Sequence, residues 1–239
     1  MRCRFALASD LGRVRTNNED SVCAVPDLGL FAVADGMGGH VAGEFASRVA
    51  LETLVEVIRG REEPKSVKDL EPLLCEAVLA SNSTVYHEAE VRGLAGMGTT
   101  LTALKVTGRT GVMAHVGDSR AYLLHEGRLR QLTRDQTLAN LMLEAGTLTP
   151  EQAAHHPERH VLLQAIGPSP TVQPDVVQAR IPRDARLLLS TDGLHDVVPD
   201  SEIQQVASGP SLSKAVHELV ARANALGGPD NVTVLLVQP

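Results

Sequence analysis

The sequence has 239 residues and a net charge of −7, with 29 acidic and 22 basic side chains, so no global basic field is present to draw in nucleic acid. Its three cysteines are widely spaced and form no C-x-x-C pair, which argues against a disulfide scaffold or a zinc–thiolate site and indicates a reducing cytosol. No apolar stretch approaches the roughly 18 residues of a membrane span, and the N-terminal apolar run is too short for a signal peptide.

The first third of the chain shows short apolar, strand-like segments and then helical periodicity. Pro26-Asp27 marks a turn before the third strand, and Gly60 ends the first helix. The charged stretch 60–69 is interpreted as a loop between two helices. The predicted elements are strands at 4–9, 20–25 and 28–35 and helices at 43–60 and 70–90.

The middle of the chain, residues 99–133, is rich in Thr and Val, and its closely spaced glycine breaks favour antiparallel hairpins. A polar segment follows, in which Gly146 separates two short predicted helices. Because this segment, near 135–167, lacks a strong core pattern, we expect it to form a surface flap. The last third predicts strands at 172–180, 185–192 and 231–237 and helices at 200–207 and 212–228.

Two predicted strands, which contain "LLLS" and "VTVLLV", are apolar on both faces. Such strands are expected where a sheet packs on a second sheet on one side and on helices on the other. The sequence therefore predicts an α+β fold, a four-layer α-β-β-α sandwich with two central antiparallel sheets flanked by helix pairs. No internal repeat or inter-domain linker is visible, so we expect residues 1–239 to form one domain, with the flap as a subregion.

Four aspartates lie at the ends of apolar strand-like runs, namely Asp35, Asp118, Asp192 and Asp230. Each alone is most simply a turn residue, because Asp and Gly are common turn formers. If the four converge at one edge of a sandwich, their mutual repulsion requires cations. Carboxylate ligands favour Mg²⁺ or Mn²⁺, and the backbone carbonyl of Gly36 could approach the same ion because glycine has no side chain.

Two further stretches carry candidate binding residues. In "VRTNNEDS", Arg15 suits bidentate recognition of phosphate and is followed by Glu19 and Asp20, although a single arginine is more simply a surface residue. The glycine-rich stretch "VADGMGGHVAGE", residues 33–44, could cradle a phosphate at a helix N-terminus. A phosphate loop needs Lys and then Ser or Thr after its last glycine, whereas this chain has His40, so a plain turn and a metal site stay open.

The chain contains in one order the stretches "VRTNNEDS", "VADGMGGH", "GMGTTLTAL", "AHVGDSRAYLL", "LLLSTDGLHDVV" and "GGPDNVTVLLV". This ordered set resembles the metal-dependent protein phosphatases of the PPM (type-2C) family in their compact bacterial form, over about residues 5–237. The resemblance implies hydrolysis of phosphoserine and phosphothreonine in proteins. It also implies that "DGMGG" is a metal-ligand turn and not a nucleotide-binding loop.

The resemblance implies a binuclear Mn²⁺ or Mg²⁺ centre and a weaker third ion. Water held by two cations would be acidified to hydroxide near neutral pH and would attack phosphorus in line, without a phosphoenzyme. Arg15 would hold the substrate phosphate. The metal residues would be Asp35 as the bridge, the Gly36 carbonyl, Asp192 and Asp230 as ligands, Glu19 and Asp20 through waters, and Asp118 with Asp192 at the third ion.

His40 is the candidate for protonating the leaving alkoxide, because an imidazole titrates near pH 6.5. Animal members of the family carry a histidine two residues after the bridging aspartate, where this chain has Met37. A catalytic role and a loop-structuring role for His40 therefore both stay open. The resemblance further implies phosphoprotein substrates, a cognate Ser/Thr kinase among them, and a cytoplasmic monomer that binds neither nucleic acid nor membrane.

Two departures from the family pattern fall in the flap. Relatives usually have Asp-His-Ser where this chain has Asp135, Gln136 and Thr137, and they often have an arginine in place of Gln164. Both departures bear on substrate preference and not on the metal chemistry. One alternative is a catalytically silent binding module, which the loss of metal carboxylates would mark. Another is a phosphatase for one phosphoserine regulator, which usually has an attached sensor domain.

Overall fold

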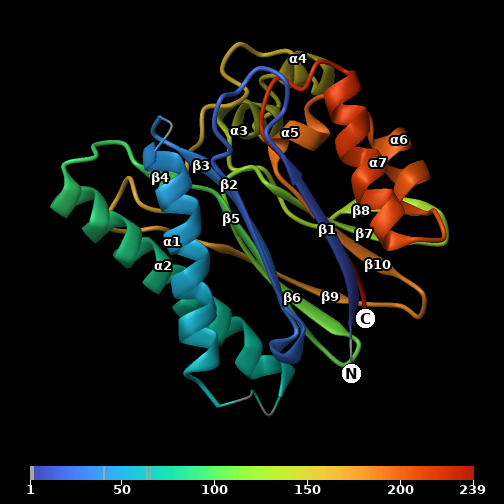
Figure 1. The fold of residues 1–239 in the computed structure, drawn as a ribbon, viewed down its shortest axis with the longest axis horizontal. Helices are drawn as coiled ribbons and strands as arrows, with labels where there is room; N and C mark the ends of the chain where they lie inside the picture. Colours follow the sequence, from blue (N-terminus) through green and yellow to red (C-terminus); the bar gives the residue numbers. More distant parts are fainter. Residues whose placement is uncertain (1–2, 40, 63, 65) are drawn as a thin grey trace.

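Two antiparallel sheets are stacked at the centre of the protein, and helices cover both outer faces (Figure 1). The structure is a computed structural model that describes residues 3–39, 41–62, 64 and 66–239. The arrangement confirms the predicted α+β fold, with layers of helices, sheet, sheet and helices. Within these described ranges, no helix is both long and apolar enough to cross a membrane.

The first sheet has the strand order β2-β3-β5-β6-β9, and β4 pairs with the end of β3. All of its strand pairs are antiparallel, as the closely spaced turns predicted. The prediction for β2 matches the observed strand residue for residue. The bounds are β2 Asp20–Val25, β3 Leu30–Met37, β4 Gly98–Thr99, β5 Leu101–Thr107, β6 Thr110–Val116 and β9 Asp175–Arg180.

The second sheet has the strand order β1-β11-β10-β7-β8, again antiparallel throughout. The first and last strands of the chain are neighbours, with Arg4 opposite Gln238 and Asp10 opposite Val232. This pairing brings the loop after β1 to the same end of the sheet as the loop before β11. The bounds are β1 Arg4–Asp10, β7 Arg120–His125, β8 Arg128–Gln131, β10 Arg186–Ser190 and β11 Val232–Gln238.

The helices α1 and α2 cover the first sheet, and α5, α6 and α7 lie on the second (Figure 1). The bounds predicted for α6 are correct, whereas α5 was not predicted because four residues are too few to show helical periodicity. The bounds are α1 Val41–Arg59, α2 Leu70–Arg92, α3 Leu138–Glu144, α4 Pro150–Ala154, α5 Asp192–His195, α6 Asp200–Ala207 and α7 Leu212–Ala225, with 3₁₀ turns at Pro26–Leu28 and Val67–Asp69.

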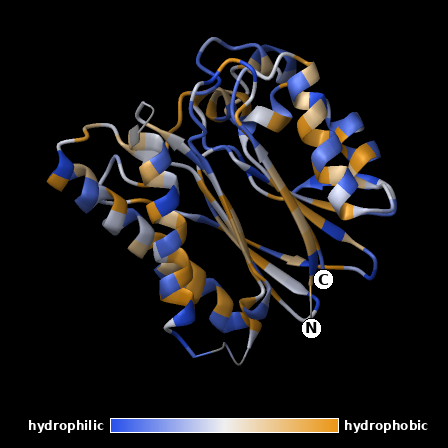
Figure 2. Ribbon diagram, viewed as in Figure 1, coloured by the Kyte–Doolittle hydropathy of each residue, from blue (hydrophilic) through white to orange (hydrophobic). Residues whose placement is uncertain are grey.

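Apolar side chains fill three layers, one between the sheets and one beneath each helical layer. Strand β3 shows how one sequence serves two of them. Leu30 and Ala32 pack toward α1 and α2, whereas Phe31 and Val33 pack between the sheets, because successive side chains of a strand point to opposite faces. Hydrophobic colouring accordingly runs along the central strands in Figure 2. Strands that are apolar on both faces are thus a property of the sandwich.

Strand β3 extends two residues past Asp35, so the prediction that the strand ends at this aspartate is wrong. The N–H of Gly36 donates to the carbonyl of Glu19 at 3.1 Å. A Cβ atom on Gly36 would lie only 2.2 Å from the carbonyl oxygen of Gly43 in α1. Because glycine has no Cβ, the strand can continue beneath the first turn of the helix instead of turning away.

The flap, residues 135–167, lies between β8 and β9 and contains the two short helices α3 and α4 that the sequence predicts. At its start, the N–H of Gln136 donates to the carbonyl of Gly117 at 2.8 Å, and the N–H of Gly117 donates to Oε1 of Gln136 at 2.9 Å. At its end, the N–H of Ile166 donates to the carbonyl of Thr99 at 2.8 Å. Both ends of the flap are therefore bonded to segments that border the candidate site.

Candidate metal centre and substrate cleft

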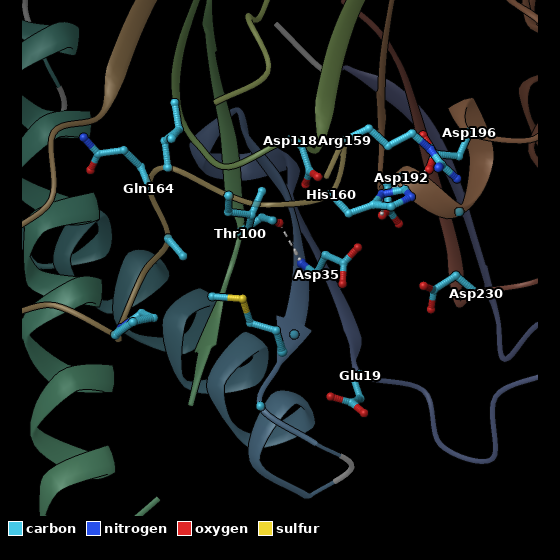
Figure 3. Close-up of a pocket in the computed structure, with 18 of the residues that line it drawn as sticks. Glu19, Asp35, Thr100, Asp118, Arg159, His160, Gln164, Asp192, Asp196 and Asp230 are labelled. Atoms are coloured by element: carbon cyan, nitrogen blue, oxygen red, sulfur yellow. Dashed lines mark hydrogen bonds and ion pairs between the residues drawn. The ribbon is translucent and has the colours of Figure 1, made fainter. Parts of the chain in front are cut away.

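A cleft of about 970 Å³ opens at one end of the sandwich, where segments of both sheets bring acidic side chains together. Figure 3 shows its carboxylates facing a common space. The cleft also includes the backbone of the loop that follows Asp35. The predicted site residues that line it are Arg15, Glu19, Asp35, Gly36, Asp118, Asp192 and Asp230.

Each central carboxylate comes from a different segment of the chain. Asp35 lies within β3, and Asp118 lies in the turn between β6 and β7. Asp192 is the first residue of α5, directly after β10, and Asp230 precedes β11. Because antiparallel strands bring alternate loops to the same end of a sheet, residues far apart in the sequence meet here.

The backbone of Asp35 is fixed by two threonines. Its N–H donates to Oγ1 of Thr100 at 2.9 Å, and its carbonyl accepts from the hydroxyl of Thr99 at 2.9 Å. The hydroxyl of Thr100 also lies 2.8 Å from that of Ser119. Because Ser119 follows Asp118, this hydroxyl pair joins the backbone that presents Asp35 to the backbone that presents Asp118.

The buried amide of Asn231 ties the N-terminal loop to β11. Its Oδ1 accepts from the N–H of Glu19 at 2.8 Å, and its Nδ2 donates to the carbonyls of Leu11 and Asn17 at 2.9 Å each. The N–H of Asn231 itself donates to Oδ1 of Asp230 at 2.8 Å. One side chain thus places the loop that carries the predicted phosphate-binding arginine beside an acidic residue of the cleft.

Burial makes negative charge costly in this cluster. Burial, and then the charge of Asp192, raise the pKa of Asp35 well above its usual range, and the same two causes raise the pKa of Asp118. Burial also raises the pKa of Asp20 to about 7 and that of Asp192 to about 6. Several carboxylates therefore share a space that contains too little positive charge, which a divalent cation would supply.

Two buried carboxylate oxygens, Oδ1 of Asp20 and Oδ1 of Asp192, accept no hydrogen bond from any described residue. The other oxygen of Asp20 accepts from the hydroxyl of Thr191 at 2.8 Å. A buried acceptor without a partner is costly. Hard, charged oxygens of this kind are the donors that Mg²⁺ and Mn²⁺ prefer, so the donor set of the cleft fits a divalent cation.

A histidine of the flap joins the carboxylates at one wall of the cleft. Asp118, His160 and Asp192 each offer one ligand atom, and these atoms all lie within 4.8 Å of one another. Nδ1 of His160 lies 3.4 Å from Oδ2 of Asp196 and 3.9 Å from Oδ2 of Asp192 (Figure 3). The sequence analysis assigned Asp118 and Asp192 to a third ion. In the structure the imidazole of His160 and the carboxylate of Asp196 lie beside these two residues.

Arg15 lies at the rim of the cleft and is paired with Asp230, with 2.7 Å between Nη2 and Oδ2. The sequence predicted separate partners for these two residues, a phosphate for Arg15 and a metal ion for Asp230. The arginine side chain remains 50% exposed, so its guanidinium still has donor groups that can reach an anion in the cleft.

Glu19 and Asp20 occupy different depths of the site. Glu19 lines the cleft, and a Cβ atom on Gly43 would lie 1.8 Å from its Oε2, so the glycine makes room for this carboxylate. Asp20 is buried behind the cleft. The predicted proton donor His40 lies outside the described residues, although the preceding loop residues Gly38 and Gly39 line the cleft.

Sequence reasoning missed three ionisable side chains of the cleft, Asp196, His160 and Arg159. A signal existed for Asp196, because it follows Asp192 by four residues and so lies one helical turn further along the chain. His160 and Arg159 belong to the flap, where no periodicity indicates which side chains face the cleft. Their position depends on the hydrogen bonds that fold the flap back on itself.

Known proteins share both the sequence and the fold. Residues 13–232 match the family described as protein phosphatase 2C. The serine/threonine protein phosphatase PstP of Mycobacterium tuberculosis is 42% identical over 98% of this chain, which spans only 44% of that protein. The serine/threonine phosphatase stp of Listeria welshimeri is 37% identical over 96% of this chain and 93% of its own length.

Two solved structures extend the match to three dimensions. The crystal structure of the Mycobacterium tuberculosis phosphatase PstP/Ppp has a TM-score of 0.92 and 41% identity, over 99% of this chain and 98% of that one. The catalytic domain of PstP in complex with two manganese ions has a TM-score of 0.88 and 38% identity, over 99% and 97% of the two chains. The chain therefore belongs to the protein phosphatase 2C family.

Proposed function

We propose that the protein removes phosphate from phosphoserine and phosphothreonine in other proteins, with two Mn²⁺ or Mg²⁺ ions as its cofactors. The observation that carries this proposal is the convergence of Asp35, Asp192 and Asp230 in one open cleft, where a buried oxygen of Asp192 accepts no hydrogen bond from the part of the chain that the structure describes. The manganese complex of the related PstP domain supports the choice of metal.

Each acidic residue has a proposed place at the cations. Asp35 would be the ligand common to both ions, and the Gly36 carbonyl, Asp192 and Asp230 would complete the protein ligands. Glu19 and Asp20 would act through bound waters, and Asp118 would hold a weaker third ion together with Asp192. When bound, two divalent cations lower the pKa of a water molecule and so supply a nucleophile near neutral pH.

The guanidinium of Arg15 binds the phosphoryl group of the substrate. Its planar fork suits two phosphoryl oxygens, and its charge offsets the negative charge that grows there in the transition state. Asp230 orients this fork through the ion pair of 2.7 Å. The half-exposed position of Arg15 allows a phosphate to bind without displacing the whole loop.

The leaving alkoxide of the substrate serine or threonine must gain a proton. We assign this step to the imidazole of His40, because it follows the loop that lines the cleft and an unperturbed imidazole titrates near pH 6.5. The competing role, structuring of the loop, predicts that His40→Ala lowers the free energy of unfolding. The catalytic role predicts instead that the variant keeps its stability and loses the alkaline limb of its pH–rate profile, because a proton donor must be protonated to act.

The relatives support a proposal for the cellular setting. We propose that residues 1–239 form one domain with the flap as a subregion, and that this domain works in the cytoplasm against a Ser/Thr kinase, itself a substrate. Phosphatases of Mycobacterium and Listeria that are similar over nearly the whole chain support this setting. Comparing the phosphoproteins of a deletion strain with those of its parent would identify the substrates.

Metal dependence tests the activity directly. Purified protein is expected to hydrolyse a phosphothreonine peptide only with Mn²⁺ or Mg²⁺, and excess chelator is expected to abolish release of phosphate. Adding Mn²⁺ beyond the chelator restores the rate. Full activity in excess chelator would disprove the metal mechanism, whereas cation binding without turnover on any phosphopeptide would identify a silent binding module.

A further inference from the structure

We propose that Arg159 of the flap determines specificity by binding an anionic group of the substrate polypeptide next to the phosphorylated residue. The group is an aspartate, a glutamate or a second phosphorylated side chain, which share the same negatively charged oxygens. This inference rests on the proposed phosphatase function and adds a preference among phosphoproteins.

Arg159 lies in the cleft that contains the predicted catalytic groups. It lines the same space as Arg15 and Asp35, and Figure 3 shows it on the wall that carries His160 and Asp196. A peptide whose phosphorylated side chain reaches Arg15 and the carboxylates would therefore have neighbouring residues within the same cleft. At about 970 Å³, the cleft is at the upper end of the range for ligand pockets and holds more than one side chain.

Hydrogen bonds of the backbone hold the segment around Arg159 in place. The N–H of Arg159 donates to the carbonyl of His156 at 3.1 Å. Four residues later, the N–H of Leu163 donates to the carbonyl of Gln136 at 2.7 Å, and the N–H of Leu138 donates to the carbonyl of Val161 at 2.9 Å. The segment is thus bonded on both sides, so the start of the arginine side chain is positioned before a substrate arrives.

The guanidinium of Arg159 forms no hydrogen bond, and no ion pair within 4.0 Å, with the other described residues, although it extends toward Asp196 and its charge acts to lower the pKa of that carboxyl (Figure 3). The other arginines nearby are already paired. Arg15 contacts Asp230 at 2.7 Å, and Arg120 donates to Asp135 at 2.6 Å. Arg159 is exposed and therefore presents a donor fork whose geometry suits a carboxylate or a phosphate.

A competing role for Arg159 is to hold the flap closed through Asp196. Oδ2 of Asp196 already lies 3.4 Å from Nδ1 of His160, so this carboxylate has a closer basic partner. The two roles predict different results. Loss of a residue that only holds the flap would slow turnover of every substrate, whereas loss of a specificity residue would slow only substrates with an acidic neighbour.

A peptide scan tests the preference. The substrate is a neutral phosphothreonine peptide of alanine and glycine, in which one glutamate is moved from four residues before the phosphothreonine to four residues after it. We expect kcat/KM of the wild-type protein with Mn²⁺ to rise about fivefold at one or two adjacent positions, which is the gain that one exposed ion pair can supply. The gain shrinks as salt is added. A second phosphothreonine at that position shows which anion is preferred.

Variants decide whether Arg159 causes the preference. Arg159→Gln is expected to abolish the gain from glutamate while leaving turnover of the neutral peptide and of p-nitrophenyl phosphate unchanged. Arg159→Glu is expected to reverse the preference toward a lysine at the same position, which a structural role would not do. The matched control is Arg183→Gln, since Arg183 is an exposed arginine in the turn between β9 and β10 and does not line the cleft.

Three outcomes would overturn the inference: a flat scan, an equal loss on all substrates in Arg159→Gln, or an unchanged preference in Arg159→Glu. Failure of the proposed function gives a different result, namely no turnover of any phosphorylated substrate. In that case, fluorescence anisotropy of the same labelled peptides still measures the preference as a difference in binding.

Discussion

Asp135 at the base of the flap and Asp192 in the cleft are the same residue type at similar burial, with side chains 15% and 18% exposed, yet their surroundings are opposite. Asp135 accepts hydrogen bonds from Nη2 of Arg120 at 2.6 Å, from Nε of Arg120 at 3.0 Å and from Nε2 of Gln131 at 2.9 Å. Asp192 faces other carboxylates and keeps one oxygen without a partner among the described residues.

The contrast separates a carboxylate that stabilises the fold from one that is available for binding. The protein supplies a guanidinium to Asp135, and that pair joins the flap to β7. At Asp192 the protein supplies more negative charge, which is unfavourable until a cation arrives. Burial alone therefore does not identify a functional carboxylate, whereas burial combined with missing partners does.

The largest expected effect is at Asp35, a carboxylate of the cleft that, like Asp192, faces other carboxylates. Asp35→Asn removes the charge proposed to bridge two cations, so we expect kcat to fall at least about 10³-fold, or roughly 4 kcal/mol. Metal-free Asp35→Asn is expected to unfold at a temperature no lower than that of the metal-free wild type at pH 7.5, because a buried negative charge is removed. Initial rates and calorimetry check both statements, and wild-type turnover would contradict the role of Asp35.

The second-largest effect is expected on stability, at the ion pair of Arg120 and Asp135. Arg120→Ala leaves the half-buried Asp135 without its guanidinium, and we expect the free energy of unfolding to fall by about 2 kcal/mol, within the range for hydrogen bonds to charged groups. Urea unfolding measures it. The control is Arg134→Ala, because Arg134 forms an exposed pair with Glu144 at 2.9 Å and should lose less than about 1 kcal/mol. Equal losses in the two variants would remove the distinction.

An intermediate effect is expected at Asp118, which would hold only the weaker ion. Asp118→Asn is expected to keep two tightly bound cations and to lose about 10- to 30-fold in turnover of phosphopeptides, or roughly 1.5–2 kcal/mol. A neutral carboxamide cannot balance a divalent cation. If Asp118 only caps the turn before β7, the variant should match the wild type, because Asn tolerates the same turn. Metal titration followed by rates distinguishes these results.

A smaller effect is expected at the pair of Arg15 and Asp230, in which a carboxylate of the cleft does have a guanidinium partner. Arg15→Ala is expected to raise KM for a phosphopeptide about tenfold, which corresponds to roughly 1.5 kcal/mol for a lost charged hydrogen bond. The neighbouring exposed arginine gives the control, Arg13→Ala, which should leave KM unchanged. An unchanged KM in Arg15→Ala would make Arg15 a surface residue.

The smallest expected effect concerns Cys23, a half-buried titratable group that does not line the cleft. Burial raises the pKa of Cys23 to about 12, so at pH 8 the native protein holds the unreactive thiol and the thiolate forms only at much higher pH. Iodoacetamide at pH 8 is expected to modify Cys23 slowly in native protein and rapidly in urea. Turnover should be unaffected in the native sample. Rapid loss of activity with alkylation of Cys23 would contradict this expectation.

Local patterns in the sequence predicted most of the helices and strands and most of the acidic residues of the site. A short apolar run predicted β2 at 20–25 correctly, because such a run next to a turn signal depends only on neighbouring residues. Apolar strands that end in aspartate pointed to a shared edge. The resemblance to the family then predicted which of these residues would bind metal ions.

Tertiary structure alone decided which side chains meet. The pairing of Arg15 with Asp230, the approach of His160 and Arg159 from the flap, and the continuation of β3 under α1 all depend on contacts between segments far apart in the sequence. No local pattern encodes such contacts, because they arise only when both sheets and the flap have packed. The same reason explains why the sequence could place Asp192 at the end of a strand and Asp135 at the start of the flap, while only the folded chain supplied a guanidinium to Asp135 and none to Asp192 among the described residues.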